Sequence, residues 1–292
     1  MKEIVIISGK GGTGKTTITA AFASLVENKV MADCDVDAAD LHLILKPEIQ
    51  HQEDFYSGKT AFIRENDCTQ CGKCVEVCQF DAINPDFIVD PVACEGCGVC
   101  VWFCPVDAID FNENLSGRWF ISKTRFGPMV HARLGIAEEN SGKLVTLVRR
   151  QAKLLAEEQN SDFIIVDGAP GIGCPVISSI TGANAVLVVT EPTLSGQHDL
   201  ERVVSLAAEH FKIPTFVCVN KYDLNGEITD QIKEFCKSNH IHFVGQIPYD
   251  DVITRAMVNG KNIIEYSNGK TAELIKNIWQ NIEDELGHVI RF

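Results

Sequence analysis

The chain has 292 residues, of which 45% are hydrophobic, so it can bury a sizeable core and is not expected to be disordered. Its formal net charge of −14 argues against nucleic acid as a partner, because binding a phosphate backbone needs a basic surface. No apolar run of about 18 residues and no N-terminal targeting segment is visible, so the sequence predicts a cytoplasmic protein without a stable membrane anchor.

Short apolar runs alternate with helical patterns along most of the chain. A buried strand is predicted over 3–8, a helix over 16–26 and a second strand over 29–35. After residue 112, the patterns predict a helix over 144–159, three strands with following polar loops over 162–171, 184–192 and 214–224, and a last short strand over 242–248. A last helix, 271–286, presents Leu274, Ile278, Ile282 and Leu286 on one face. The alternation predicts an α/β fold with a mostly parallel sheet flanked by helices.

Residues 9–16, GKGGTGKT, lie between the first predicted strand and the first predicted helix. They fit the pattern G-x-x-x-x-G-K-[ST] of a phosphate-binding loop, in which glycines let backbone N–H groups converge on phosphate oxygens at a helix N-terminus. Lys15 is expected to reach the β- and γ-phosphates and the Thr16 hydroxyl to bind Mg²⁺. The loop contributes these predicted ATP-binding residues: Gly11, Gly12, Thr13, Gly14, Lys15, Thr16 and Thr17.

Asp167 stands at the end of the apolar strand in DFIIVDGAPG. An acid in this position is typical of a Walker B residue, which holds Mg²⁺ through water. The sequence therefore predicts that Thr16 and Asp167 share a magnesium site.

The loop KGGTGKTT resembles the deviant P-loop of the MinD, ParA and nitrogenase iron protein superfamily. The resemblance implies a nucleotide-sandwich dimer in which Lys10 reaches the partner's nucleotide. DCDVDAADLHLIL, residues 33–45, resembles the switch I segment of that superfamily, so Asp35 is expected to orient the attacking water and to lie near Mg²⁺. Lys10, Lys15 and Asp35 are the predicted catalytic residues.

Two further ATP-binding residues follow from the same resemblance. Gly171 matches a switch II glycine whose N–H senses the γ-phosphate, and Asn220 in VNKYD matches an asparagine that hydrogen-bonds adenine. The N-K-x-D pattern also suggests guanine readers, but the superfamily favours ATP.

Eight of the twelve cysteines form two runs of C-x2-C-x2-C-x3-C, with Pro105 after the second run. This is the spacing of bacterial ferredoxins with two 4Fe–4S clusters, in which the fourth cysteine of each run binds the other cluster. Zinc is the competing thiolate-bound metal, but zinc sites more often pair two C-x2-C units. The predicted ligand sets are Cys68, Cys71, Cys74 and Cys104 for one cluster, and Cys78, Cys94, Cys97 and Cys100 for the other.

The cysteine runs define the predicted domain organisation. Residues 59–111 are expected to form an inserted, small α+β ferredoxin domain, and residues 1–58 and 112–292 a discontinuous ATPase domain. The inserted segment has nine Asp/Glu and three Lys/Arg, a net charge of about −6, which suits a partner with a basic face. Cys34, Cys218 and Cys236 are expected in the core. For Cys174 two alternatives stay open, a packing role in the switch loop and a role as a ligand of a bridging cluster.

Taken together, these motifs resemble the MinD-superfamily P-loop ATPases with an inserted ferredoxin domain. The resemblance implies an ATP-hydrolysing protein in which nucleotide-driven dimer switching is coupled to electron transfer. The expected cofactors are two 4Fe–4S clusters, Mg²⁺ and ATP or ADP; the expected partners are a second copy or a paralogue, and a redox protein. The alternatives are an iron–sulfur cluster carrier and a redox-sensing regulatory switch. The segment 127–145 is a further candidate, as a loop coupled to the switches through Arg133, Glu138 and Glu139.

Overall fold

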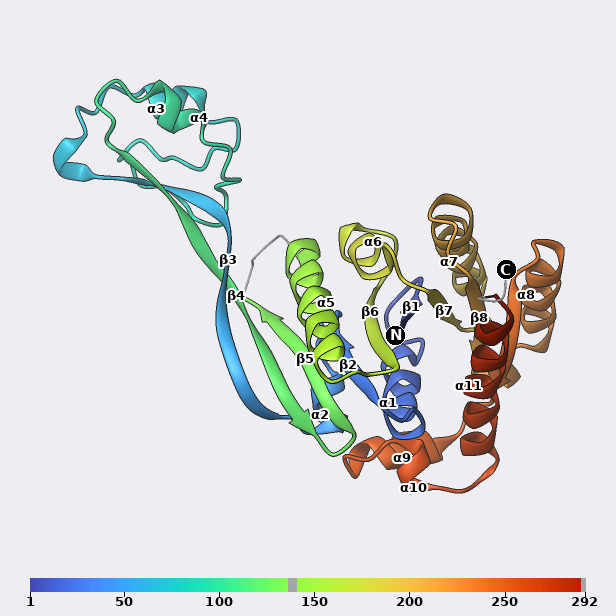
Figure 1. Ribbon diagram of the computed structural model, residues 1–292. Coiled ribbons are helices and arrows are strands. Elements are labelled where there is room, and N and C mark those ends of the chain that lie inside the picture. Colours follow the sequence, from blue (N-terminus) through green and yellow to red (C-terminus); the bar gives the residue numbers. More distant parts are fainter. Residues whose placement is uncertain (136–140, 290–292) are drawn as a thin grey trace. The chain divides into compact units, whose positions relative to one another are not determined.

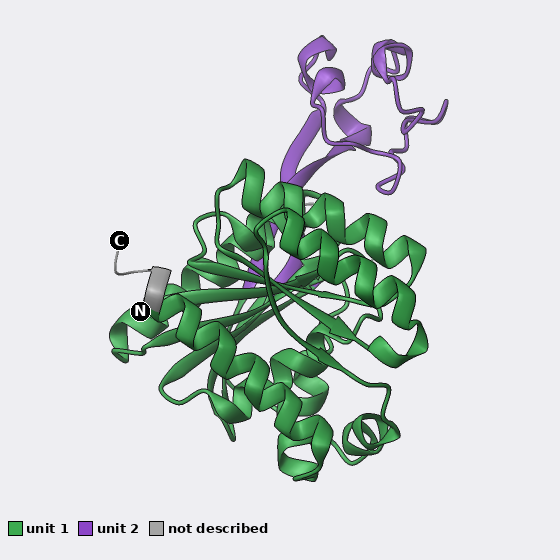
Figure 2. Ribbon diagram, turned by 90° about the vertical axis from the view of Figure 1, so that its right-hand side faces the viewer, with its two compact units in different colours: residues 1–53, 119–133, 141–292 green, residues 54–118, 134–140 purple. Residues whose placement is uncertain are grey.

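A computed structural model describes residues 1–135 and 141–289 of the chain (Figure 1). Glu138 and Glu139, which belong to the hypothesis on segment 127–145, lie outside the described residues. The chain divides into two compact units, shown in separate colours in Figure 2. Unit 1 contains residues 1–53, 119–133 and 141–289, and unit 2 contains residues 54–118 with Leu134 and Gly135.

The strands of the described chain form one nine-stranded sheet, in the order β3-β4-β5-β2-β6-β1-β7-β8-β9. From β5 to β9 every neighbouring pair in that order is parallel, which confirms the predicted α/β class. The strands are β1 (Lys2–Ser8), β2 (Lys29–Asp33), β3 (Glu48–Ile63), β4 (Ile109–Thr124), β5 (Gly127–Leu134), β6 (Phe163–Pro170), β7 (Ala185–Thr190), β8 (Thr215–Asn220) and β9 (His242–Ile247).

The helices of unit 1 flank this sheet (Figure 1). Helices α5 and α6 contact β6, while α1 and α11 share a core with Ile4 and Ile6 of β1. The α-helices of both units, of which α3 and α4 lie in unit 2, are α1 (Lys15–Leu25), α2 (Leu41–Leu45), α3 (Lys73–Val77), α4 (Val99–Phe103), α5 (Ser141–Glu158), α6 (Cys174–Ile180), α7 (Leu194–Val204), α8 (Gly226–Ser238), α9 (Asp251–Val258), α10 (Ile263–Tyr266) and α11 (Lys270–Val289). None of them combines the length and apolar composition needed to cross a membrane, within the described residues.

Three strands, β3, β4 and β5, were not predicted from the sequence. The first seven residues of β3 are exposed, so its sequence carries no apolar alternation. The prediction of a loop over segment 127–145 is wrong for residues 127–134, where β5 pairs with β2 and buries Met129, Val130 and Ala132.

His131 explains why β5 was not predicted, since a histidine in the middle of the segment makes an otherwise apolar strand look polar. Its ring stacks on Phe120 at a centroid distance of 4.9 Å, and its Nε2 lies 2.9 Å from the Ser122 hydroxyl. Burial, with a contribution from His42, lowers the pKa of His131 to about 4, so the imidazole is neutral and packs as a core side chain.

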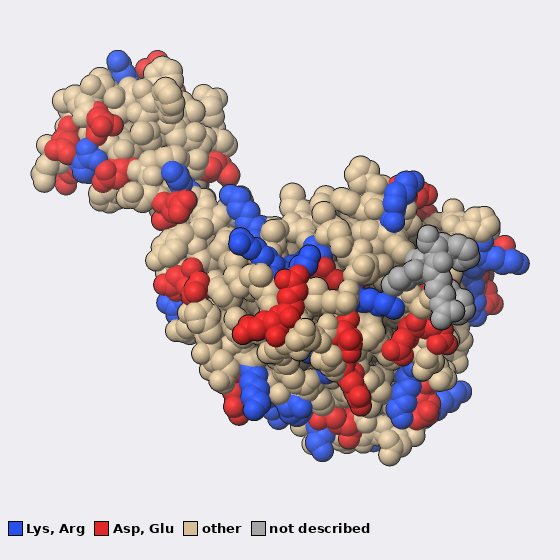
Figure 3. All heavy atoms as spheres, in the orientation of Figure 1, with Lys and Arg blue, Asp and Glu red and all other residues tan. Residues whose placement is uncertain are grey.

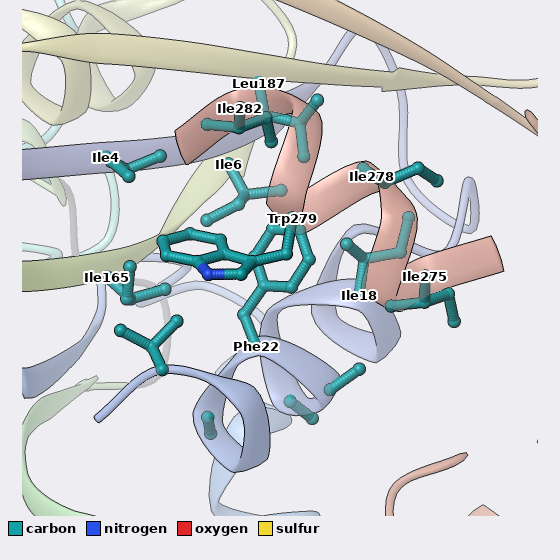
Figure 4. Packing of buried hydrophobic residues seen from close by; sticks show 14 of the residues in the cluster. Ile4, Ile6, Ile18, Phe22, Ile165, Leu187, Ile275, Ile278, Trp279 and Ile282 are labelled. Atoms are coloured by element: carbon teal, nitrogen blue, oxygen red, sulfur yellow. The ribbon is translucent and has the colours of Figure 1, made fainter. Parts of the chain in front are cut away.

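Aromatic packing joins α11 to the sheet and to α1 (Figure 4). The Trp279 ring meets Phe22 at a centroid distance of 5.1 Å and Phe163 at 5.5 Å, both edge-to-face. Ile275, rather than the predicted Leu274, completes the buried face of α11, while Leu274 is only half-buried. The i, i+4 pattern predicted the helix correctly, but at its N-terminal end it assigned Leu274 to the buried face in place of the neighbouring Ile275.

We expect Trp279→Ala to lower the free energy of unfolding by about 3–5 kcal/mol, because it removes a buried ring and leaves a cavity between Phe22 and Phe163. Urea titration followed by circular dichroism measures this loss. Leu274→Ala, on the same helix, is the control and should cost clearly less. Equal losses in the two variants would show that the aromatic contact does not anchor α11.

Candidate nucleotide site and cysteine hollows

The phosphate-binding loop joins β1 to α1, as the motif predicts. Gly14 stands immediately before α1 with φ of 92°, a left-handed conformation that strains other residues. A Cβ atom on Gly14 would lie 2.3 Å from the Asn220 side-chain nitrogen, so glycine is also required by close approach. That nitrogen donates to the Thr13 carbonyl over 2.8 Å and ties the loop to the end of β8.

Lys15 is buried at the start of α1 and faces two acids. Its Nζ lies 3.0 Å from an oxygen of Asp167 and 3.1 Å from an oxygen of Asp35. Burial opposes the charged form, but the two carboxylates outweigh it and raise the pKa of Lys15 to about 12. The ammonium is therefore charged at every physiological pH and is available to a phosphate.

Asp167, at the end of β6, is the centre of a hydrogen-bond network. The Thr16 hydroxyl donates to one carboxylate oxygen over 2.7 Å, and the Thr19 hydroxyl donates to the other over 2.9 Å. Thr16 and Asp167, the predicted magnesium pair, are thus in direct contact. Thr19 was missed, because a threonine one turn into a helix carries no sequence signal of its own.

Asp33 and Asp35 lie at the end of β2. Asp33 pairs in register with Asp167 on β6 and is fully buried. One of its oxygens accepts the Asp35 backbone N–H over 3.2 Å, and the other has no hydrogen-bond partner among the described residues. Burial raises the pKa of both carboxyls, and the charge of Asp167 adds to the rise. This end of the sheet therefore concentrates acids around one lysine.

Lys10 contacts the loop between β7 and α7 and the first turn of α7. Its Nζ lies 3.3 Å from the Thr193 hydroxyl, 3.2 Å from the Ser195 hydroxyl and 4.0 Å from Glu191. Glu191 also forms an ion pair with Lys221, in the N-K-x-D segment. In this chain alone, then, Lys10 contacts its own β7–α7 loop and the start of α7.

A pocket of about 510 Å³ opens over the loop. Its lining includes all the predicted ATP-binding residues except Gly171, together with Asp35. Gly171 lies in the loop after β6, with φ of 90° and its N–H bonded to the Ser8 carbonyl. Both polar groups of the Asn220 side chain bond to backbone, at Thr13 and Lys221, so its predicted contact with adenine stays a prediction.

The pocket is also lined by residues that no sequence motif marks. They lie in the loop after β9 and in α9, and include Tyr249, Ile253 and Met257. Only topology could have indicated these residues: ligands of parallel sheets bind beyond the carboxyl ends of the strands, and the loop after β9 lies at such an end.

Unit 2 contains two small hollows with four cysteines each, drawn from both runs. The first hollow, about 20 Å³, is lined by Cys68, Cys71, Cys74 and Cys104. The second hollow, also about 20 Å³, is lined by Cys78, Cys94, Cys97 and Cys100. Each hollow therefore combines three cysteines of one run with the last cysteine of the other.

Apolar side chains enclose the hollows, and backbone groups face the sulfurs. Phe87 and Ile109 line the first hollow, and Ile83 and Phe111 line the second. The Gln70 N–H lies 3.4 Å from Cys68 Sγ, and the Ala108 N–H lies 3.3 Å from Cys104 Sγ. Within the described residues, no three His, Cys, Asp or Glu side chains converge as the donors of a single metal ion would.

The other four cysteines belong to unit 1. Cys34, Cys218 and Cys236 are buried, as predicted, and burial raises the pKa of each thiol. Cys174 is exposed at the first residue of α6.

Comparison with known proteins gives the family of this chain. The CobQ/CobB/MinD/ParA nucleotide binding domain matches residues 4–263. MJ0578, an uncharacterized protein of Methanocaldococcus jannaschii, is 35% identical over 97% of this chain and 96% of its own. MJ0579 of the same organism is 28% identical over 92% of this chain and 94% of its own.

A solved structure shares the fold. MinD from Pyrococcus horikoshii, complexed with Mg-ADP, has a TM-score of 0.59 and 18% identity, and the match covers 98% of this chain and 97% of that one. The phosphate-binding loop, its buried lysine and the paired acids lie within the matched family domain. The chain belongs to the CobQ/CobB/MinD/ParA family of nucleotide-binding domains and is a MinD/ParA-like P-loop ATPase.

Proposed function

We propose that this protein binds and hydrolyses ATP as a switching dimer and couples that switch to electron transfer through two 4Fe–4S clusters. The observation that carries the proposal is the composition of the two cysteine hollows, together with a nucleotide site of the MinD/ParA type in the same chain. Each hollow has the four cysteines that the crossed spacing assigns to one cluster. In this proposal, residues 59–111 form the inserted ferredoxin domain, and residues 1–58 and 112–292 form the ATPase domain.

The donor set fits a 4Fe–4S cluster. Each iron of such a cluster binds one protein thiolate, so four cysteines can surround a hollow without converging on a single point. The walls are apolar, and the backbone N–H groups of Gln70 and Ala108 point to sulfurs, which is the environment that tunes cluster potentials. When bound, the clusters supply one-electron chemistry; the chain supplies the thiolates and the enclosing walls.

The nucleotide site is arranged to exchange one ion pair for another. Lys15 now neutralises Asp35 and Asp167, and a triphosphate in the pocket competes for the same ammonium. Once Lys15 turns to phosphate, Asp35 and Asp167 are free to hold Mg²⁺ with the Thr16 hydroxyl. Bound Mg²⁺ would neutralise charge on the phosphates, while Asp35 would orient the attacking water.

Dimerisation supplies the second lysine. Lys10 is about one-third exposed and lies on the hydroxyls of Thr193 and Ser195, contacts that it can leave at little cost. In the dimer it would reach the nucleotide of the partner. The partner is a second copy or a paralogue, and M. jannaschii carries two relatives of this chain, which is consistent with the second choice.

A redox-sensing regulatory switch is the second candidate function. The proteins named MinD among the relatives are septum site-determining proteins, with 24% identity in Bacillus subtilis. In that case the clusters would report redox state to a MinD-like switch instead of delivering electrons.

Cysteine variants test the crossed ligand sets. Cys104→Ser should remove iron from the first hollow only, and Cys78→Ser from the second only, because each takes one thiolate from one set. Iron analysis and EPR of the dithionite-reduced protein should show about half of the wild-type iron in each variant. Cys174→Ser is the control and should retain all of it. Zinc in place of iron, or no iron in the anaerobically purified wild type, would refute the cluster proposal.

Lys10→Ala should leave nucleotide binding nearly unchanged and lower ATP turnover by at least about 100-fold, as expected for a cation that stabilises phosphoryl-transfer charge. Phosphate release and sedimentation velocity with ATP measure turnover and dimer formation. Ser195→Ala, which removes only a neighbour of Lys10, should keep both. Wild-type ATP turnover in Lys10→Ala would contradict the proposal that Lys10 acts on the nucleotide of the partner.

Coupling is tested by EPR-monitored redox titration under anaerobic conditions, with and without Mg-ATP. If ATP closes a dimer around the switch segments, at least one cluster potential should move by about 60 mV, a tenfold change for a one-electron couple. Lys15→Ala, which cannot respond to phosphate, should show no movement. Identical potentials with and without ATP, together with unchanged electron-transfer rates, would favour the regulatory switch.

A further inference from the structure

Helix α4 presents an apolar face to solvent. Val99, Trp102 and Phe103 occupy positions i, i+3 and i+4 of the helix and so lie on one side of it. Trp102 is 90% exposed, Phe103 57% and Val99 38%. An indole this exposed is unfavourable in water, since burying an aromatic side chain is worth a few kcal/mol. Covering this face with a partner's apolar surface would therefore be favourable in free energy.

The matching helix of the first cysteine run shows that this face is not needed for the fold. α3 has the sequence KCVEV and α4 has VCVWF, in equivalent places of the repeated cysteine pattern. Both follow a glycine with positive φ, and they contact each other. α3 carries Lys73 and Glu76 where α4 carries Val99 and Trp102. The third position is apolar in both helices, Val77 in α3 and Phe103 in α4, so the same local structure forms with polar residues at two of the three face positions.

The charge of unit 2 indicates what kind of surface covers α4. Residues 54–118 hold eleven Asp/Glu against four Lys/Arg, a net charge of −7. Acidic side chains are visible on the face of unit 2 that Figure 3 shows. An apolar centre within an acidic unit suits a partner with an apolar patch and a basic rim, because opposite charge steers the encounter and apolar contact holds it.

Helix α4 contains a cysteine of one hollow and directly precedes a cysteine of the other. Cys100 lies within the helix and turns inward, with 9% of its surface exposed, and Cys104 follows its last residue. Cys100 belongs to the second hollow and Cys104 to the first. Val99 itself lines the second hollow, and Phe103 directly precedes Cys104 of the first, so a molecule seated on this face of α4 lies close to both hollows.

We propose that the exposed face of α4, centred on Trp102, is the docking surface for a redox protein with a basic rim around its own cofactor. This inference rests on the proposed function, because it needs reducible clusters in the hollows. In the transfer, one electron leaves a reduced cluster and enters the partner's cofactor, with no bond made or broken.

A basic c-type cytochrome serves as the probe, with the whole protein reduced by dithionite and freed of the excess. One electron reduces ferric haem to ferrous haem, which stopped-flow absorbance follows. Trp102→Gln should lower the second-order rate constant roughly tenfold, as expected for an aromatic hot spot, and Phe103→Gln by a smaller factor. The rate with a small neutral quinone should stay the same, since the quinone needs no docking face.

Two control substitutions distinguish an effect of the α4 face from an effect of charge or exposed apolar surface elsewhere in unit 2. Glu76→Gln removes a charge at the equivalent position of α3, and Ile88→Gln replaces another apolar side chain of unit 2, one that is 64% exposed. Both should change the cytochrome rate by less than about twofold. Losses as large as that of Trp102→Gln in either control would overturn the proposal, and so would a wild-type rate in Trp102→Gln.

Cluster loss and self-association are tested separately in the same variants. Iron content and EPR of every variant show whether the clusters are intact; their absence in the wild type would refute the proposed function, and the docking proposal with it. Sedimentation velocity of Trp102→Gln should match the wild type. A change in oligomeric state would show that the face joins two copies of this chain, which would overturn the redox-partner proposal.

Discussion

The ion pairs of Lys15 with Asp167 and Asp35 are the constraint around which unit 1 is organised. Removing both acids would leave the buried Lys15 ammonium without a counter-charge, which costs several kcal/mol. The three side chains come from α1, from β6 and from the end of β2, so these elements must meet at one edge of the sheet. The same requirement makes the site responsive, because a phosphate offers Lys15 a different anion and leaves two carboxylates to be satisfied.

The two units are stabilised by different means. Unit 1 has an extensive apolar core, in which α1 and α11 close over β1 through Phe22 and Trp279. Unit 2 has a small core in which Cys74 and Cys100 are buried beside Ile83 and Ile109. A core of that size needs additional cross-links, and metal binding supplies free energy of folding directly. In the proposed function, cluster ligation therefore has a structural role as well as a redox role.

Signals that are local in sequence predicted most of the site, and long-range pairing accounts for what was missed. The phosphate-binding loop, Asp167 and the cysteine spacing each lie within a few residues of chain, where chemistry fixes the order of residue types. β3 was missed because exposed strands show no alternation, and β5 because buried His131 looks like a surface residue. Thr19 and Tyr249 reach the site only through tertiary structure, which a single sequence does not display.

The chain connection between the switch segment and unit 2 gives the proposed coupling a physical route. Asp35 is followed by α2, and α2 leads directly into β3, the strand that enters unit 2. The return strand β4 is followed at once by Arg125, whose guanidinium donates to the Ile44 carbonyl of α2 over 2.8 Å and pairs with Glu265. Both strands that join the units are thus attached to α2 at their unit 1 ends. In the proposed function, exchange of Lys15 for Mg²⁺ at Asp35 would act first on α2, to which the unit 1 ends of both strands are attached.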